Sequence, residues 1–237
     1  MKNKTSFTSG RDQWHEAFPI NEAQRAAKFL YDTWEDLVAN KPKGFRPTLR
    51  ENQLTEKFYP FLVRLSQGKG RLTGFWHNEA RHSDIDEDEP EDPKVINRIR
   101  KDITYTSNAD GGRLELIFEF KKLSANNSSW KNYRGIEGMR RFVDGHYAHG
   151  LPIALMVGML MGEADECVKG LKRSLLSKAS REDLRMVSRA GDKYIFEPSI
   201  VFHGIALFDT EHNRPVHMAP SHGIMLLSHI FVTMPKE

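Results

Sequence analysis

The sequence predicts an α/β fold, because segments with helical and strand patterns alternate along the chain. Apolar residues recur at helical spacing in its first third, two strands of alternating polarity follow at 101–107 and 113–123, and an apolar run without alternation occupies 152–160. This order is typical of a mixed sheet covered by helices. With 237 residues the chain is long enough for a single domain with a full apolar core.

Two helices are expected near the N-terminus, after a loosely docked arm at residues 1–20. The first is expected at about 21–39, where large apolar residues share one helical face: Phe29, Leu30, Trp34, Leu37 and Val38. The motif KPKGFRP ends this helix, because proline and glycine interrupt helical structure. The same spacing of apolar residues predicts a second helix at about 49–66.

Residues 67–99 are expected to form a long loop or an excursion from the domain, because glycines come first and a run of acids follows. The segment 84–92 reads DIDEDEPED and holds seven acids and no base. With these acids set aside, the formal charge of the chain rises from +3 to +10. A basic body suits a polyanionic partner, and the acidic segment could mask that basic surface.

The two strands are joined by NADGG, a turn-rich connection that predicts an antiparallel hairpin. Alternate residues of a strand share a face. Matching the apolar faces sets Ile103 opposite Phe118, and the same register sets Asp102 opposite Glu119. Like charges on opposed residues are destabilising, so these two carboxylates need a cation between them. Lys121, on the same face, supplies one, and a hard divalent ion such as Mg²⁺ would supply the rest.

After the hairpin a helix is expected at about 129–148, with Ile136 and Tyr147 on its apolar face and its arginines elsewhere. The apolar run at 152–160 is expected to be a strand buried on both faces, because it has no polar alternation. The remainder is expected to add a helix at 164–180 and strands within 194–209 and 223–234.

The stretches KDITYTS and LELIFEFKKL resemble the core of the PD-(D/E)XK nuclease superfamily, which has a restriction-endonuclease-like fold. Asp102 takes the place of the first acid, and Glu119, Phe120 and Lys121 that of the E-x-K motif. One departure is Lys101, which stands where the family motif has proline.

The flanking elements extend this resemblance over residues 48–160. In the superfamily a helix that often bears an acid precedes the hairpin, and a helix and a buried strand follow it. The helical acid corresponds best to Glu51, with Glu56 as the alternative. Residues 161–237 would add a helix and strands, so that 1–237 form one nuclease-like domain.

The resemblance implies a Mg²⁺-dependent endonuclease, in which Mn²⁺ can substitute, acting on nucleic acid and on DNA rather than RNA. It implies that Asp102, Glu119, the Phe120 backbone carbonyl and Glu51 hold the metal, and that Lys121 orients the attacking water. It also suggests a microbial defence or restriction effector. The sequence has no recognisable helix-turn-helix or zinc finger, so specificity would come from the shape of the nucleic acid, from a homodimer or from a partner subunit.

Two other classes of function stay open. One is a catalytically inactive nuclease fold that binds nucleic acid or serves as a scaffold. The other is a histidine-centred metallohydrolase, although no histidine here has a recognisable metal-binding spacing. Its candidate ligands are His203, His212, His217 and His222 in the C-terminal third, with His77 and His82 before the acidic segment.

Composition indicates a cytoplasmic protein. Cys167 is the one cysteine, which excludes an internal disulfide and fits a reducing compartment. The N-terminal residues lack the apolar region of a secretory signal. No segment approaches the roughly 18 consecutive apolar residues of a membrane span, so no membrane partner is expected.

Overall fold

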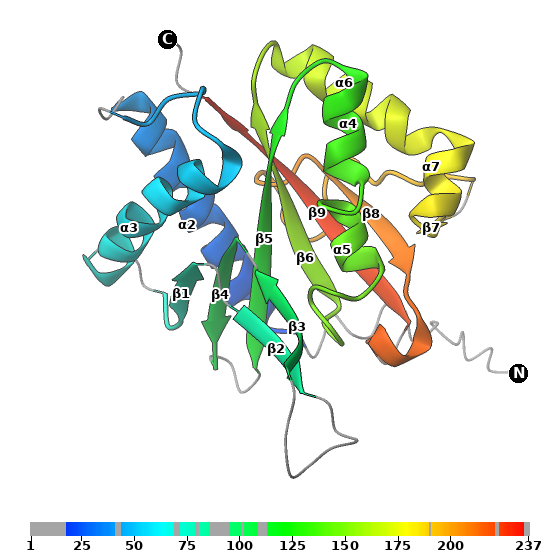
Figure 1. Ribbon diagram of the computed structural model, residues 1–237, viewed down its shortest axis with the longest axis horizontal. Helices are drawn as coiled ribbons and strands as arrows, with labels where there is room; N and C mark the ends of the chain where they lie inside the picture. Colours follow the sequence, from blue (N-terminus) through cyan, green and yellow to red (C-terminus); the bar gives the residue numbers. More distant parts are fainter. Residues whose placement is uncertain are drawn as a thin grey trace, which may run out of the picture.

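The computed structural model describes residues 18–40, 44–68, 72–78, 81–85, 95–100, 102–108, 113–189, 191–220 and 223–234. Its centre is a seven-stranded mixed sheet (Figure 1), which confirms the predicted α/β class. The strands are β1 (Phe75–Asn78), β4 (Ile103–Ser107), β5 (Leu114–Leu123), β6 (Ile153–Leu160), β7 (Met186–Val187), β8 (Phe208–Asn213) and β9 (Ile224–Thr233).

The order of strands across the sheet is β1-β4-β5-β6-β9-β8-β7. β5, β6 and β9 are parallel to one another, and every other neighbouring pair is antiparallel. β6 lies in the middle and is buried at every position. This burial explains its unbroken apolar sequence, because both of its faces are covered by helices.

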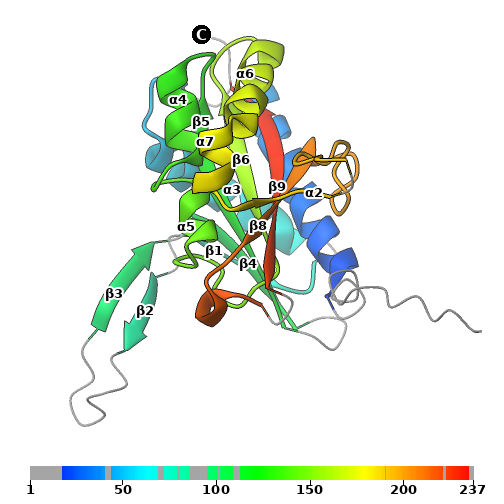
Figure 2. The same ribbon diagram turned by 90° about the vertical axis from the view of Figure 1, so that its right-hand side faces the viewer.

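Helices cover the two faces of the sheet (Figure 2). They are α2 (Ile20–Ala39), α3 (Glu51–Gly68), α4 (Asn127–Arg134), α5 (Met139–Val143), α6 (Ala164–Leu176) and α7 (Lys178–Asp183), with a short 3₁₀ helix, η2 (Val216–Met218). Each face has its own apolar core. Trp34 of α2 packs against Phe58 of α3 and Phe120 of β5 on one side, and Tyr133 of α4 and Phe142 of α5 are buried on the other. No helix within the described ranges is both long and apolar enough to span a membrane.

The β4–β5 hairpin has the predicted register. Ile103 pairs with Phe118 and Tyr105 pairs with Leu116. β4 begins at Ile103, one residue after Asp102, and β5 continues well beyond the Ile103–Phe118 pair to Leu123. One edge of β5 is therefore left without a strand partner from Glu119 onward.

The segment 67–99, expected as a long loop or an excursion, contains three strands among its described residues. β1 joins the edge of the main sheet, and β2 (Arg81–Ile85) and β3 (Val95–Arg100) form a separate two-stranded sheet. β1 has only four residues, and Trp76 holds it in place by packing on Tyr105. Such long-range packing leaves no local pattern in the sequence. Of the acidic segment 84–92, residues 86–92 lie outside the described residues, as do residues 1–17 of the N-terminal arm.

Two expected helices are each divided in two. The helix expected at 129–148 stops at Arg134, and Ile136 is exposed instead of buried. A Cβ atom at Gly138 would lie 2.0 Å from the Tyr133 carbonyl oxygen, so this close turn requires glycine. The helix expected at 164–180 is interrupted at Ser177, whose side chain accepts a hydrogen bond from the Ser180 N–H and caps α7.

The strand expected within 194–209 begins only at Phe208. Most of the preceding residues form turns that are organised by Asp209. The buried carboxylate of Asp209 accepts hydrogen bonds from the Ser199 hydroxyl and the Ile200 N–H. This apolar segment therefore packs onto the sheet as a loop rather than as a strand.

Candidate active site

The free edge of β5 is capped by two carboxylates from other elements. The Phe120 N–H donates to Asp102 Oδ2 at 3.0 Å, and the Lys122 N–H donates to Glu51 Oε1 at 2.9 Å. Asp102 directly precedes β4, and Glu51 is the first residue of α3. Both acids thus occupy positions that a longer β4 would have filled, and both are brought to one point of the sheet.

Lys121 joins the acids of this edge. Its ammonium lies 2.9 Å from Glu119 Oε1 and 3.2 Å from Glu51 Oε2. Glu51, and not the exposed Glu56, is therefore the helical acid that reaches the site. Burial would lower the pKa of Lys121, but the negative charges of Glu119, Glu51 and Asp102 outweigh it and raise that pKa. Lys121 consequently stays protonated.

Glu119 is the most unusual group of the site, because its carboxylate is fully buried in the sheet. Within the described residues, Oε2 has no hydrogen-bond partner, and Oε1 is held by the ion pair with Lys121. Burial and then the negative charge of Asp102 raise the pKa of Glu119 to about 8, although Lys121 opposes the shift. The pKa of Asp102 is also raised, mainly by burial. The paired part of β4 begins at Ile103, so Asp102 and Glu119 do not form the strand pair that the register predicted, although the charge of Asp102 disfavours ionised Glu119.

An arginine that the sequence did not single out completes the site. The Arg141 guanidinium of α5 lies 3.6 Å from Glu119 Oε1 and also contacts the Tyr147 hydroxyl and the Glu137 carboxylate. Its Cζ lies 5.1 Å from the centre of the Tyr147 ring. The break between α4 and α5 changes the helical phase after Arg134, so a continuous helix could not predict where Arg141 points.

The loop that carries Tyr147 is held by Arg214, which is buried, unlike the partly exposed Arg141. Arg214, just after β8, donates hydrogen bonds to the carbonyl oxygens of Tyr147 and Ala148. Ala148 has a φ of 54°, a left-handed conformation that a non-glycine residue adopts only when its surroundings hold it there. Arg214 is therefore a positioning residue for Tyr147 and, through it, for Arg141. No local pattern in the sequence marks it.

The residues at the end of β5 offer oxygen ligands of the kind that Mg²⁺ prefers. The unpartnered oxygen of Glu119 and its repulsion from Asp102 fit a cation. However, no group of three or more His, Cys, Asp or Glu side chains in the described ranges is arranged to hold a metal ion. Lys121 bridges Glu51 and Glu119 instead. Phe120 takes part through its backbone N–H, and its ring belongs to the core with Trp34.

The histidines of the rival site do not gather in the part of the chain that is described. His77, His203 and His217 are exposed at separate places, whereas His212 is fully buried. His222 lies outside the described residues, and for His82 only the backbone is described.

His212 belongs to a buried hydrogen-bond chain together with His229, which the sequence did not single out. His212 Nδ1 lies 2.8 Å from the Leu184 carbonyl oxygen, and its Nε2 lies 2.8 Å from Thr210 Oγ1. The same hydroxyl lies 3.0 Å from His229 Nε2, and the Tyr133 hydroxyl lies 3.0 Å from His229 Nδ1. Because a carbonyl oxygen only accepts, His212 carries its proton on Nδ1. The direction of every hydrogen bond in this series, from Leu184 to Tyr133, is then fixed. Both histidines are neutral, since burial lowers their pKa values, that of His212 to about 4.

His212→Ala is expected to lower the free energy of unfolding by about 2–4 kcal/mol, because it leaves a cavity and unpaired polar groups in the core. The arrangement of the residues at the end of β5 should stay unchanged. Urea unfolding measures the first effect, and His217→Ala, at an exposed position, is the control that should change stability by less than about 0.5 kcal/mol. Loss of hydrolysis from a His212→Ala protein of normal stability would instead favour the histidine-centred metallohydrolase.

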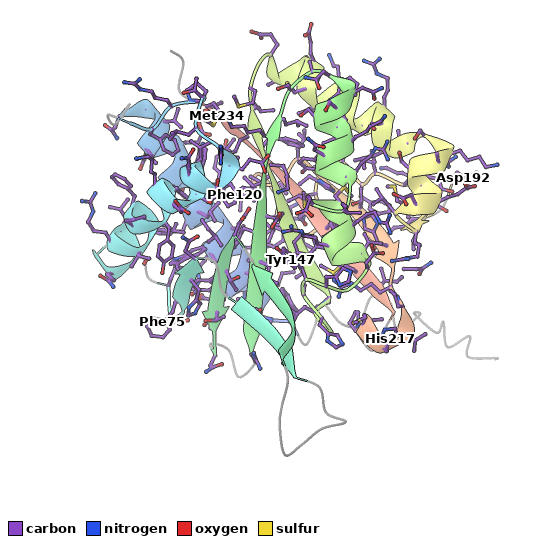
Figure 3. All side chains as sticks on the ribbon, viewed as in Figure 1. Phe75, Phe120, Tyr147, Asp192, His217 and Met234 are labelled. Atoms are coloured by element: carbon purple, nitrogen blue, oxygen red, sulfur yellow. The ribbon has the colours of Figure 1, made fainter. Side chains whose placement is uncertain are left out.

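Comparisons of the chain with protein-family models, with curated proteins and with solved structures found no match. A functional conclusion therefore depends on the chemistry of the residues at the end of β5. Phe120 and Tyr147 mark the two faces of the sheet around this site (Figure 3).

Proposed function

We propose that this protein is a Mg²⁺-dependent endonuclease of the PD-(D/E)XK type that hydrolyses phosphodiester bonds of DNA. The observation that carries the proposal is the buried Glu119 carboxylate, which has an unpartnered oxygen, is repelled by Asp102 and is paired with Lys121. Repelling acids beside a buried lysine are costly to fold and are typical of sites that perform chemistry.

The order of elements around the site supports the same proposal. α3 supplies an acid, β1, β4 and β5 form an antiparallel meander, α4 and α5 follow, and β6 pairs in parallel with β5. The helix before the β4–β5 hairpin, the helices after it and the parallel strand β6 support the core order that the resemblance implies, to which β1, β2 and β3 are additions. A microbial defence or restriction role in the cytoplasm is proposed from that resemblance.

The side chains of the site would have distinct roles. Asp102, Glu119, Glu51 and the Phe120 carbonyl would hold Mg²⁺ or Mn²⁺, which would polarise the scissile phosphate and lower the pKa of the attacking water. Lys121 would donate a hydrogen bond to a phosphate oxygen and stabilise the charge that develops there. Arg141 would turn from Glu119 towards a second phosphate oxygen, for which a planar guanidinium is well suited.

A second candidate function is a nuclease-fold subunit that binds nucleic acid without cutting it. The bridging of Glu51 and Glu119 by Lys121 favours this alternative, because it gives both acids a cationic partner without a metal. Such a subunit would act within a homodimer or together with a catalytic partner.

The two candidates are separated by incubating the protein with supercoiled plasmid, linear duplex, single-stranded DNA and RNA, each with Mg²⁺, Mn²⁺ or EDTA. We expect DNA cleavage with either metal and none with EDTA. Binding of nucleic acid without cleavage under any of these conditions would favour the non-cutting subunit. If the protein neither binds nor cleaves any of these nucleic acids, both candidates are excluded.

A further inference from the structure

The two-stranded β2–β3 sheet, here called the ribbon, stands apart from the main sheet and projects from the body of the protein (Figure 2). Both ends of the ribbon lie close to the start of β4. β1 ends at Asn78, shortly before the ribbon begins, and Asn78 pairs with Ile103. At its other end, β3 finishes at Arg100, two residues before Asp102. Two residues span at most about 7 Å, so the base of the ribbon lies beside the proposed active site.

The two faces of the ribbon differ in charge. Its register pairs Arg81 with Arg100 and Ser83 with Arg98, and it pairs His82 with Ile99 and Asp84 with Asn97. Alternate positions of a strand lie on opposite faces. One face of the ribbon therefore holds three arginine positions and no acid, whereas the other holds one acid and no lysine or arginine.

The size and shape of the ribbon suit the major groove of a DNA duplex. That groove is about 12 Å wide and admits a two-stranded antiparallel ribbon. The five residues of β2 extend over about 17 Å, or about half a helical turn. The major groove of an RNA duplex is too narrow to admit protein elements.

We propose that the ribbon docks in the major groove of duplex DNA with its arginine-bearing face toward the duplex, and so holds the substrate beside Asp102. This inference rests on the proposed function and names its substrate as a duplex of DNA rather than RNA or a single strand. The binding surface consists of the two described strands alone.

The test measures the affinity for a DNA duplex in EDTA, at several salt concentrations, for the variant Arg81→Ala/Arg98→Ala/Arg100→Ala. The slope of log affinity against log salt is negative, and each lost phosphate contact makes it less steep by about 0.9. If each of the three arginines contacts one phosphate, the slope should become less steep by about 2.7 and the affinity near 0.1 M salt should fall on the order of a hundredfold. The control, His82→Ala/Asn97→Ala, changes the opposite face and should bind like the wild type.

Thermal melting should be unchanged in the triple variant, because the ribbon is separate from the main sheet. If the triple variant does not fold, the three single variants should each make the slope less steep by about 0.9. An unchanged slope and affinity would overturn the ribbon proposal, and so would an equal loss of affinity for an RNA duplex or a single strand. If the ribbon proposal fails but the wild type cleaves DNA, the proposed function still stands. If the wild type neither binds nor cuts DNA, the ribbon proposal and the proposed function are both excluded.

Discussion

Lys121→Ala is expected to lower the rate of Mg²⁺-dependent DNA cleavage by about 10²–10³-fold, while the affinities for DNA and Mg²⁺ stay near those of the wild type. The substitution removes the ammonium that lies 2.9 Å from Glu119 and 3.2 Å from Glu51, but it leaves every proposed metal ligand in place. A loss of this size is typical when one preorganised stabiliser of a developing negative charge is removed. Single-turnover cleavage, DNA binding in EDTA and thermal melting would be measured on the same preparations.

Lys122→Ala is a matched control for this experiment. It removes the same charge one residue further along β5, from a side chain that reaches the Pro47 carbonyl instead of the acids, and it keeps the backbone N–H that Glu51 accepts. Its cleavage rate should stay close to that of the wild type. If Lys121→Ala cuts as fast as the wild type, the end of β5 is not the active site.

The hairpin and its charged residues could be predicted from sequence because their information is local. β4 and β5 each have one apolar face, and a short connection limits the possible registers, so the pairing of Ile103 with Phe118 follows directly. Once that register is fixed, Asp102, Glu119 and Lys121 have to lie near one another. Glu51 is assigned from the resemblance, which calls for an acid in the helix before the hairpin, and it is the first residue of α3.

The features that sequence reasoning missed depend on long-range packing. β1 is too short for a pattern and is held by the contact of Trp76 with Tyr105. Arg141 reaches Glu119 because the chain breaks its helix near Gly138, which changes the direction of everything that follows. Arg214 acts on a loop that lies far from it in the sequence. Spacing along a single element cannot reveal contacts of this kind.

Glu119→Gln is expected to abolish cleavage and, in the absence of metal, to stabilise the protein above neutral pH. The pKa of Glu119 is raised to about 8, well above the 4.5 of an ordinary glutamate. Between these two values the folded state binds more protons than the unfolded state, so the stability of the wild type falls as the pH rises from about 5 to 8. Glutamine does not titrate, and the variant should lose this part of the pH dependence.

The size of the effect can be measured by thermal melting in EDTA at pH 5 and pH 8. One pKa unit corresponds to about 1.4 kcal/mol, and each kcal/mol moves the Tm of a chain of this size by about 2–4 °C. We therefore expect Glu119→Gln to melt at least about 5 °C above the wild type at pH 8 and close to it at pH 5. Added Mg²⁺ at pH 8 should raise the Tm of the wild type, because bound metal stabilises the folded state, but it should raise that of the variant much less.

Glu115→Gln is the control, because it changes a half-buried glutamate on the same strand and the same face. It should leave the pH dependence, the response to Mg²⁺ and the cleavage rate close to those of the wild type. Two results together would contradict this prediction: Glu119→Gln melts like the wild type at pH 8, and Mg²⁺ does not raise the Tm of the wild type. They would mean that Lys121 and Arg141 already neutralise Glu119. The acids at the end of β5 would then serve to cap the strand, and the non-cutting subunit would be the better account of the fold.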